Sequence, residues 1–144
     1  MIRKATGNDA RILGEMAVQM WDSHNVEDLE TEFSESITCE ATAFFIKYEG
    51  NKPAGFAQVG LRSDYVEGTE TSPVGYLEGV FVKPEHRKKG YARELLAQCQ
   101  LWAKEKGCAE FASDCELSNA ESLKFHIAVG FSEANRIICF TKKL

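Results

Sequence analysis

Apolar residues recur at helical spacing in four segments of the chain, and this periodicity predicts four helices. The predicted helices cover residues 8–21, 26–37, 89–106 and 118–130. Asn8 and Asp9 are good capping residues for the first helix, and Ser118 and Glu121 have the spacing of a capping box for the fourth. Gly107 suits the position just after the C-terminus of the third helix.

Short apolar runs bounded by turn residues predict six strands. They cover residues 1–6, 43–48, 54–62, 74–82, 110–114 and 136–144. The run "VGYLEGVFV" (74–82) is apolar almost throughout apart from Glu78, so it is expected in the centre of the sheet. The order β-α-α-β-β-β-α-β-α-β indicates an α/β fold with a mixed central sheet, antiparallel at first and parallel around residues 84–96. No linker interrupts this order, so residues 1–144 are expected to form a single domain.

Composition and charge narrow the classes of function. The chain has 17 basic and 22 acidic residues, and its formal charge of −5 argues against general nucleic-acid binding. The five cysteines form no CxxC pair and the three histidines are scattered, so neither a disulfide framework nor a metal site is expected. No segment has the length of a membrane span or the apolar core of a signal peptide. These features predict a soluble cytoplasmic protein.

The stretch "PEHRKKGYARELL" (84–96) sets three cations, Arg87, Lys88 and Lys89, at the start of a predicted helix. The positive end of the helix dipole makes cations mildly unfavourable there, and Gly90 costs about 1 kcal/mol relative to Ala. A bound anion would compensate, because open backbone N–H groups, a glycine and flanking cations together form a phosphate cradle. The alternative interpretation is a basic loop with a chance glycine.

The turn from Arg87 to Ala92 matches R/Q-x-x-G-x-G/A between a strand and a helix, and a second helix ends in "VGF" (129–131). This pattern resembles the GCN5-related N-acetyltransferase (GNAT) superfamily, in which strands 4 and 5 are parallel and splayed. The resemblance implies acetyl-CoA as co-substrate, with its pyrophosphate held by backbone amides of the turn. The implied cofactor-binding residues of the turn are Lys88, Lys89, Gly90, Tyr91, Ala92 and Arg93.

A closer resemblance covers nearly the whole chain. The segments "YVEGTETSPVGYLEGVFVKPEHRKKGYA" and "FASD…N…H…VGF", with a tryptophan that closes the first helix, are similar to the small aminoglycoside 6'-N-acetyltransferases. These enzymes confer resistance by acetylating a polycationic antibiotic. The resemblance implies an aminoglycoside site formed by Trp21, His24, Tyr65, Glu78 and Asp114, and an acetyl-pantetheine site formed by Val80, Phe81, Val82 and Asn119.

The same resemblance implies a homodimer. The apolar run "IICF" (137–140) supports it, because an exposed strand edge of this kind would be a liability. One position departs from the pattern: where relatives can carry an acid that reaches the substrate of a partner subunit, this chain has Asn135. Asn135 is therefore a candidate residue for contact with the substrate.

Glu78 has a physical argument of its own, because a carboxylate in a central apolar strand needs a hydrogen bond or a cation to offset its desolvation. We expect Glu78 to orient or deprotonate the acceptor amine, and the alternative is a structural ion pair, for example with Arg62. Gly79 beside it predicts a bulge that re-aims side chains. Asp114 follows a predicted parallel strand, where α/β sheets place ligands, and its alternative role is an ordinary loop cap.

His126 lies four residues before Gly130, where many members of the superfamily place a tyrosine that protonates the departing thiolate. Imidazole can act as a general acid near neutral pH, so His126 is a second catalytic candidate. The alternative is a structural histidine. Trp21 and Tyr65 likewise have the alternative of being plain core or surface aromatics.

The expected mechanism is direct attack of an amine on the thioester of acetyl-CoA, without a covalent enzyme intermediate. A backbone N–H near residues 80–82 would stabilise the oxyanion, and Glu78 would take a proton from the amine. Together with Asp114, the acidic loop 63–70 gives this site a negative potential that suits a small polycationic acceptor. The alternatives are acetylation of a protein N-terminus, a lysine or a polyamine, and a non-catalytic acyl-CoA-binding domain.

Overall fold

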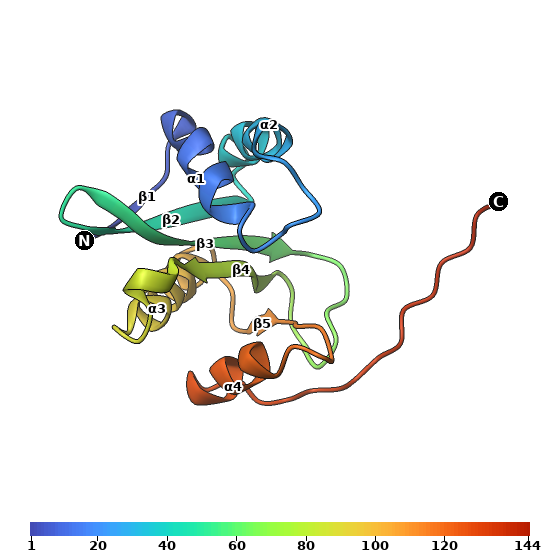
Figure 1. The fold of residues 1–144 in the computed structure, drawn as a ribbon. Coiled ribbons are helices and arrows are strands. Elements are labelled where there is room, and N and C mark those ends of the chain that lie inside the picture. Colours follow the sequence, from blue (N-terminus) through green and yellow to red (C-terminus); the bar gives the residue numbers. More distant parts are fainter.

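Five strands form one mixed sheet in the computed structural model, which describes residues 1–144 (Figure 1). The strands are β1 (Ile2–Lys4), β2 (Thr42–Glu49), β3 (Lys52–Arg62), β4 (Val74–Val82) and β5 (Phe111–Ser113). They lie in the order β1-β2-β3-β4-β5, antiparallel from β1 to β4 and parallel between β4 and β5. The predicted α/β fold with a mixed sheet is therefore confirmed, and the apolar run 74–82 lies inside the sheet.

Four α-helices and two short 3-10 turns connect the strands. They are η1 (Gly7–Asp9), α1 (Ala10–Ala17), α2 (Val26–Ile37), η2 (Pro84–His86), α3 (Tyr91–Glu105) and α4 (Ala120–Ala128). Helix α1 ends at Ala17, short of the predicted end near Trp21. The N-cap of α4 is Asn119 rather than Ser118, and its side chain accepts a hydrogen bond from the Ser122 N–H. No helix combines the length and apolarity needed to cross a membrane.

The sheet separates two hydrophobic cores, one under α1 and α2 and the other under α3 (Figure 1). Successive side chains of a strand point to opposite faces of its sheet. In β2, Phe44 and Ile46 therefore pack toward α1 and α2, whereas Ala43 and Phe45 face α3. The ring of Phe44 lies 4.9 Å from that of Phe33 in α2. Packing on both faces holds the central strands in place and fixes the position of β4.

A β-bulge interrupts β4 at Glu78. Gln58 of β3 is opposite Gly79 of β4. The next residue of β3, Val59, is opposite Leu77, so Glu78 is an extra residue without a partner. The bulge predicted beside Gly79 is confirmed, and its extra residue is the candidate catalytic glutamate.

The predicted strand over residues 136–144 is not formed in the single chain. Residues 132–144 run instead as an extended arm that leaves the body of the molecule, without a partner strand or a backbone-to-backbone hydrogen bond (Figure 1). The apolar run 137–140 suits a strand, but a strand forms only where its backbone groups find partners. The arm has none, and Ile137, Ile138 and Phe140 are exposed.

A partly buried ion pair connects the first strand to the turn η1 before the first helix. The side chain of Asp9, which is 5% exposed, accepts hydrogen bonds of 2.7 and 2.8 Å from the Arg3 guanidinium. It also accepts hydrogen bonds from the N–H and the hydroxyl of Thr6, at 2.7 and 3.2 Å. The bonds from Arg3 and Thr6 outweigh the burial and lower the pKa of Asp9 to about 2.

We expect Asp9→Asn to lower the free energy of unfolding by about 2 kcal/mol near neutral pH, because the lost carboxylate has a pKa of about 4 in the unfolded chain. Since folding lowers this pKa, the stabilisation is complete above about pH 4 and is lost as the pH falls toward about 2. Urea unfolding at neutral and acidic pH would measure the difference between variant and wild type. The exposed Asp22 offers the control Asp22→Asn. A difference that does not shrink in acid would contradict this role of Asp9.

Candidate active site

Strands β4 and β5 pair over only three residues and then diverge. Their parallel register begins at Gly75 and ends at Leu77, which lies opposite Ser113. Beyond this point no strand pairs with residues 78–82 on that edge of β4. The expected splay is therefore present, and it leaves backbone N–H and C=O groups of β4 available to a ligand.

The cationic turn follows the splayed end of β4 and opens α3. Gly90 is the N-cap, with a left-handed φ of 81°, and Lys88 also has a positive φ, of 63°. No side chain caps this helix, so its first N–H groups are left for another acceptor. A Cβ atom added at Gly90 would meet no atom within 4 Å, so the space beside it is open. Free N–H groups at the positive end of a helix form an anion site.

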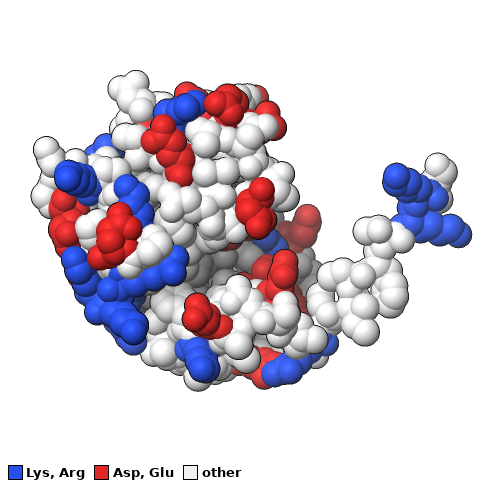
Figure 2. Space-filling model, viewed as in Figure 1, with Lys and Arg blue, Asp and Glu red and all other residues white.

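Most of the positive charge of the turn is not neutralised by carboxylates. Arg87 and Arg93 donate only to backbone carbonyls, and Lys88 has no hydrogen-bonded or ionic partner. Figure 2 shows Lys and Arg side chains gathered on the side of the molecule where α3 begins. Both the open helix start and the free cations therefore favour an anionic ligand such as a pyrophosphate.

Glu49, the last residue of β2, connects the β2–β3 hairpin to this turn. Its carboxylate accepts a hydrogen bond of 2.8 Å from Lys89 and one of 2.5 Å from the Tyr91 hydroxyl. The Nδ1 atom of His86 lies 3.1 Å from the same carboxylate. The bonds from Lys89 and Tyr91 lower the pKa of Glu49 to about 2. One of the candidate phosphate-binding cations is thus already paired within the protein.

The other predicted cofactor residues lie along β4 and at the start of α4. Phe81 packs into the core under α1 and α2, whereas Val80 and Val82 pack into the core under α3. Because these side chains are occupied, a ligand would meet the backbone edge of β4 rather than its side chains. Asn119 uses its carbonyl oxygen to cap α4, which leaves its NH₂ group free to donate.

Glu78 forms an ion pair with Arg62, the last residue of β3. The guanidinium donates to both carboxylate oxygens, over distances of 3.0 to 3.2 Å. The side chain of Glu78 is 30% exposed and that of Arg62 is 42% exposed. Glu78 is therefore partly buried, and the cation expected to offset its desolvation is present as Arg62. The alternative partner Arg62 is present, but an exposed ion pair contributes only about 0–1 kcal/mol.

Asp114 follows β5 on the same side of the site. The Tyr76 hydroxyl donates a hydrogen bond to its carboxylate. Burial of Tyr76 and the bond to Asp114 both raise the pKa of the tyrosine. The guanidinium carbon of Arg62 lies 3.3 Å from the centre of the Tyr76 ring. The structure thus brings Glu78 and Asp114 together around one aromatic ring and one cation.

Trp21 and His24, in the segment between α1 and α2, differ in their surroundings. A Cβ atom added at Gly79 would lie 3.0 Å from the Trp21 ring, so this ring covers β4 next to Glu78. It also contacts the core, where its centroid lies 6.4 Å from that of Phe33. His24 is exposed, and its only side-chain hydrogen bond is with the neighbouring Ser23.

The loop 63–72 between β3 and β4 is tied to the segment before β5. The Glu110 carboxylate accepts hydrogen bonds of 2.8 and 2.5 Å from the N–H and hydroxyl of Thr71. Tyr65 is 78% exposed in this loop, and Asn135 of the arm donates to Glu67 at 3.0 Å. The loop lines a cavity of about 290 Å³, and Figure 2 shows acidic side chains around the adjoining hollow. The single chain therefore leaves Tyr65 exposed and joins Asn135 to the acidic loop.

His126 of α4 contacts the splay through Ser113. Its Nε2 atom lies 2.8 Å from the Ser113 hydroxyl oxygen, which lies 3.3 Å from the Leu77 carbonyl. Its Nδ1 atom lies 2.6 Å from the Ser122 carbonyl. Both ring nitrogens thus have partners within the protein, as a structural histidine would. The same bonds also form a chain of exchangeable protons that ends where β4 and β5 diverge.

Three residues of this site are not identified from the sequence in their observed roles: Arg62, Tyr76 and Ser113. Tyr76 lies two residues before Glu78, so strand periodicity could have placed both on one face. Arg62 enters the sequence interpretation only as an ion-pair partner, because register across a long loop cannot be read from sequence. No group of three or more His, Cys, Asp or Glu side chains is arranged to hold a metal ion.

Known proteins resemble this chain in sequence. Residues 13–131 match the model of the acetyltransferase (GNAT) family. The chain is 40% identical over 126 residues to the aminoglycoside N(6')-acetyltransferase type 1 of Serratia marcescens, which covers 87% of this chain and 86% of that protein. It is 38% identical over 144 residues to the protein of the same name from Stenotrophomonas maltophilia, which covers 99% of this chain and 93% of the relative.

Solved structures agree with the fold. AAC(6')-Iy in complex with the bisubstrate analogue CoA-S-monomethyl-acetylneamine has a TM-score of 0.95 at 35% identity, over 100% of this chain and 98% of that chain. The apo aminoglycoside 6'-N-acetyltransferase of Acinetobacter haemolyticus has a TM-score of 0.95 at 33% identity, over 100% and 99% of the two chains. Because the family model spans most of the sequence and the fold agrees along its length, this chain belongs to the acetyltransferase (GNAT) family.

Proposed function

We propose that this protein transfers the acetyl group of acetyl-CoA to the 6'-amino group of aminoglycoside antibiotics. The observation that carries the proposal is the position of two carboxylates, Glu78 and Asp114, beside the free edge of β4. This acidic site suits a polycationic amine, and the open start of α3 suits the phosphates of an acyl donor. The printed names of the relatives and the bisubstrate complex of AAC(6')-Iy support this pair of substrates.

The donor site extends from the free edge of β4 to the start of α3. The backbone N–H groups of residues 88–93 bind the pyrophosphate, and the free cations around them add charge-assisted contacts. The pantetheine arm lies along residues 80–82, where a backbone N–H donates to the acetyl carbonyl. The NH₂ group of Asn119 is a further donor toward the cofactor.

The reaction joins the acceptor nitrogen to the acetyl carbon as the C–S bond of the thioester breaks. A backbone N–H on the edge of β4 stabilises the oxyanion that forms during the attack. Glu78 accepts the proton that the amine loses, directly or through a water. The thiolate of CoA takes up a proton from the Ser113 hydroxyl, which regains one from the Nε2–H of a protonated His126, so that His126 is the general acid and Ser113 the relay. Trp21, His24, Tyr65 and Asn135 are the proposed contacts to the rest of the acceptor.

The test of this function is thiol release from acetyl-CoA with kanamycin, spermidine, lysine and a peptide with a free N-terminus. We expect turnover with kanamycin, and Glu78→Gln should lower its kcat by about 100-fold or more, because the amide cannot accept the proton. Since the pair with Arg62 is exposed, the free energy of unfolding should change by no more than about 1 kcal/mol. Glu105→Gln, at the exposed end of α3, is the matched control.

The amine panel also separates the alternatives. Turnover with the peptide, lysine or spermidine but not with kanamycin would show that this amine, and not an aminoglycoside, is the acceptor. Binding of acetyl-CoA without turnover of any amine would indicate a non-catalytic domain. A Glu78→Gln variant with normal kcat and a large loss of stability would refute the proposed role of Glu78.

The phosphate cradle is tested by Gly90→Val. We expect acetyl-CoA affinity to fall by at least about tenfold, because the added side chain enters the open space beside the helix start and strains a left-handed φ. Gly107→Val is the matched control, since Gly107 ends the same helix with a φ of 90° and also has no neighbour within 4 Å. Calorimetry should show normal affinity for that control. Equal affinity in both variants would contradict the cradle.

We propose that residues 1–144 act as one N-acetyltransferase domain that confers aminoglycoside resistance in the cytoplasm. All five cysteines are free, and three of them are exposed, which suits a reducing compartment. An acetyl-CoA-dependent reaction also needs a compartment that supplies this donor. No nucleic-acid or membrane partner is proposed.

We also propose a homodimer, in which the arm of each chain (132–144) binds the other copy. Contacts of Asn135 with Glu67 and of Ala134 with Gly68 direct the start of the arm over its own loop, and the rest projects away from the body (Figure 1). Three basic residues and one acid give the arm a formal charge of +2, so the remainder of the chain carries −7. Exposed apolar side chains and opposite charge both favour docking on a second copy.

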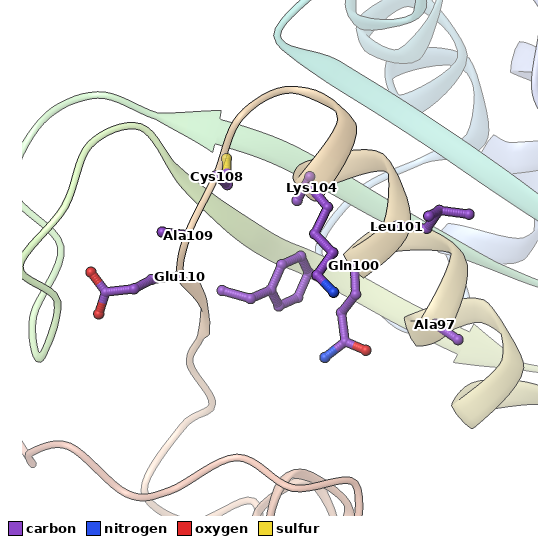
Figure 3. Close-up of a pocket in the computed structure, with 9 residues that line it drawn as sticks. Ala97, Gln100, Leu101, Lys104, Cys108, Ala109 and Glu110 are labelled. Carbon is purple, nitrogen blue, oxygen red and sulfur yellow. The ribbon is translucent and has the colours of Figure 1, made fainter.

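The proposed docking surface is the free edge of β5 with the groove between it and α3. No strand pairs with this edge, so it can accept an extended chain. The groove has a volume of about 420 Å³ (Figure 3). Its lining residues are Ala97, Gln100, Leu101, Ala103, Lys104, Cys108, Ala109, Glu110 and Phe111. In an extended arm Ile138 and Phe140 point to one side and can enter this groove together.

We expect wild-type protein to sediment as a dimer at micromolar concentration and Ile138→Asp to sediment as a monomer, because the charge would be buried against the groove. Leu101→Asp, in the groove, should have the same effect. Leu117→Asp is the control, since Leu117 is 81% exposed and lies in neither surface. A monomeric wild type, or dimers that both aspartate variants leave intact, would refute this assembly.

A further inference from the structure

Arg62 lies where the proposed reaction needs the ammonium group of the acceptor. Its guanidinium bonds both carboxylate oxygens of Glu78 and stacks on the Tyr76 ring, with its central carbon 3.3 Å from the ring centre. The hydroxyl of that ring donates to Asp114. The face of an aromatic ring with carboxylates nearby is a site for a cation. In the free protein a side chain of the chain itself occupies it.

The surrounding charges hold this cation in place. Burial works against the charged guanidinium, but the bonds to Glu78 and the negative charges of Glu78 and Asp114 outweigh it and raise the pKa of Arg62. No other cation pairs with either carboxylate. Arg62 therefore offsets one of the two carboxylate charges of the acceptor site before any substrate arrives.

The contact is nevertheless exchangeable. The side chain of Arg62 is 42% exposed and that of Glu78 is 30% exposed, and ion pairs of this exposure are weak. Arg62 is the last residue of β3, so its side chain can swing toward the loop 63–72 without disturbing the sheet. The guanidinium also occupies both carboxylate oxygens of Glu78, so an acceptor amine can contact these oxygens only after Arg62 has moved.

We propose that Arg62 is an internal counter-cation that the ammonium group of the acceptor displaces from Glu78 and Asp114. The inference rests on the proposed function for the identity of the acceptor. Displacement exchanges one cation for another, so a single ammonium gains little from the site. Further ammonium groups of a polycation gain contacts with the acidic loop. Arg62 thus adds a small constant cost that acceptors with several charges offset most easily.

The test measures acceptor binding by calorimetry without acetyl-CoA, and turnover separately. For Arg62→Gln we expect the affinity for kanamycin and for spermidine to rise by about fivefold, the value of a favourable exposed pair. The KM for kanamycin should fall accordingly, with kcat unchanged or higher, because Glu78 is freed as a proton acceptor. Arg62→Lys keeps the charge without the bidentate contact, so its affinity for both polycations should lie between those of the wild type and Arg62→Gln.

Arg11→Gln is the matched control. Arg11 is 49% exposed and pairs with Glu15, Glu27 and Glu30 away from the site, so its loss changes the net charge equally without freeing Glu78. Unchanged or weaker binding of both polycations by Arg62→Gln, or a lower kcat, would overturn the inference and make Arg62 a structural or positioning residue. If the wild type acetylates no aminoglycoside, the proposed function fails, while the binding comparison with spermidine still decides the role of Arg62.

Discussion

The early end of the pairing between β4 and β5 is the constraint on which the rest of the site depends. Because β5 has three residues and the pairing stops at Leu77, β4 continues with one free edge. At this point the bulge turns Glu78 out of the sheet. One strand thereby places a free backbone edge next to a carboxylate. Packing on both faces of the sheet keeps this open edge rigid, so it is pre-organised for the thioester.

The proposed donor site and the proposed acceptor site each contain one side chain with the same sign of charge as the ligand expected there. Glu49 pairs with Lys89 in the phosphate cradle, and Arg62 pairs with Glu78 in the acceptor site. Both pairs are partly exposed, so neither is a rigid support, and a substrate can replace the internal ion at small cost. Each pair offsets only part of the charge around it, because Arg87 and Arg93 pair with no carboxylate and Asp114 pairs with no cation.

Like the free edge of β4, the arm (132–144) has no partner strand. Its apolar residues and β-branched composition would form a strand, yet the chain directs it away from the nearby free edge of its own sheet. That edge belongs to β5, whose shortness also creates the splay. An assembly that covers β5 from outside would therefore stabilise the strand that limits the active site. The proposed dimer contact and the divergence of β4 from β5 therefore involve the same short strand, β5.

The sequence by itself determined most of the elements and the cationic turn, because these depend on local rules. Helical periodicity, the apolar run 74–82 and the glycine after three cations each reflect contacts within a few residues, and the bulge beside Gly79 followed from the same local reasoning. The resemblance to a known family added the acceptor residues, of which Trp21, Glu78 and Asp114 lie together. Only the tertiary structure decided that Glu78 is partly exposed and that its alternative partner Arg62 does bind it. It also decided that Tyr76 bonds Asp114 and stacks on Arg62, and that the last segment is an unpaired arm. These features depend on strand register across a long loop and on whether an edge finds a partner, and residues far apart in sequence set both.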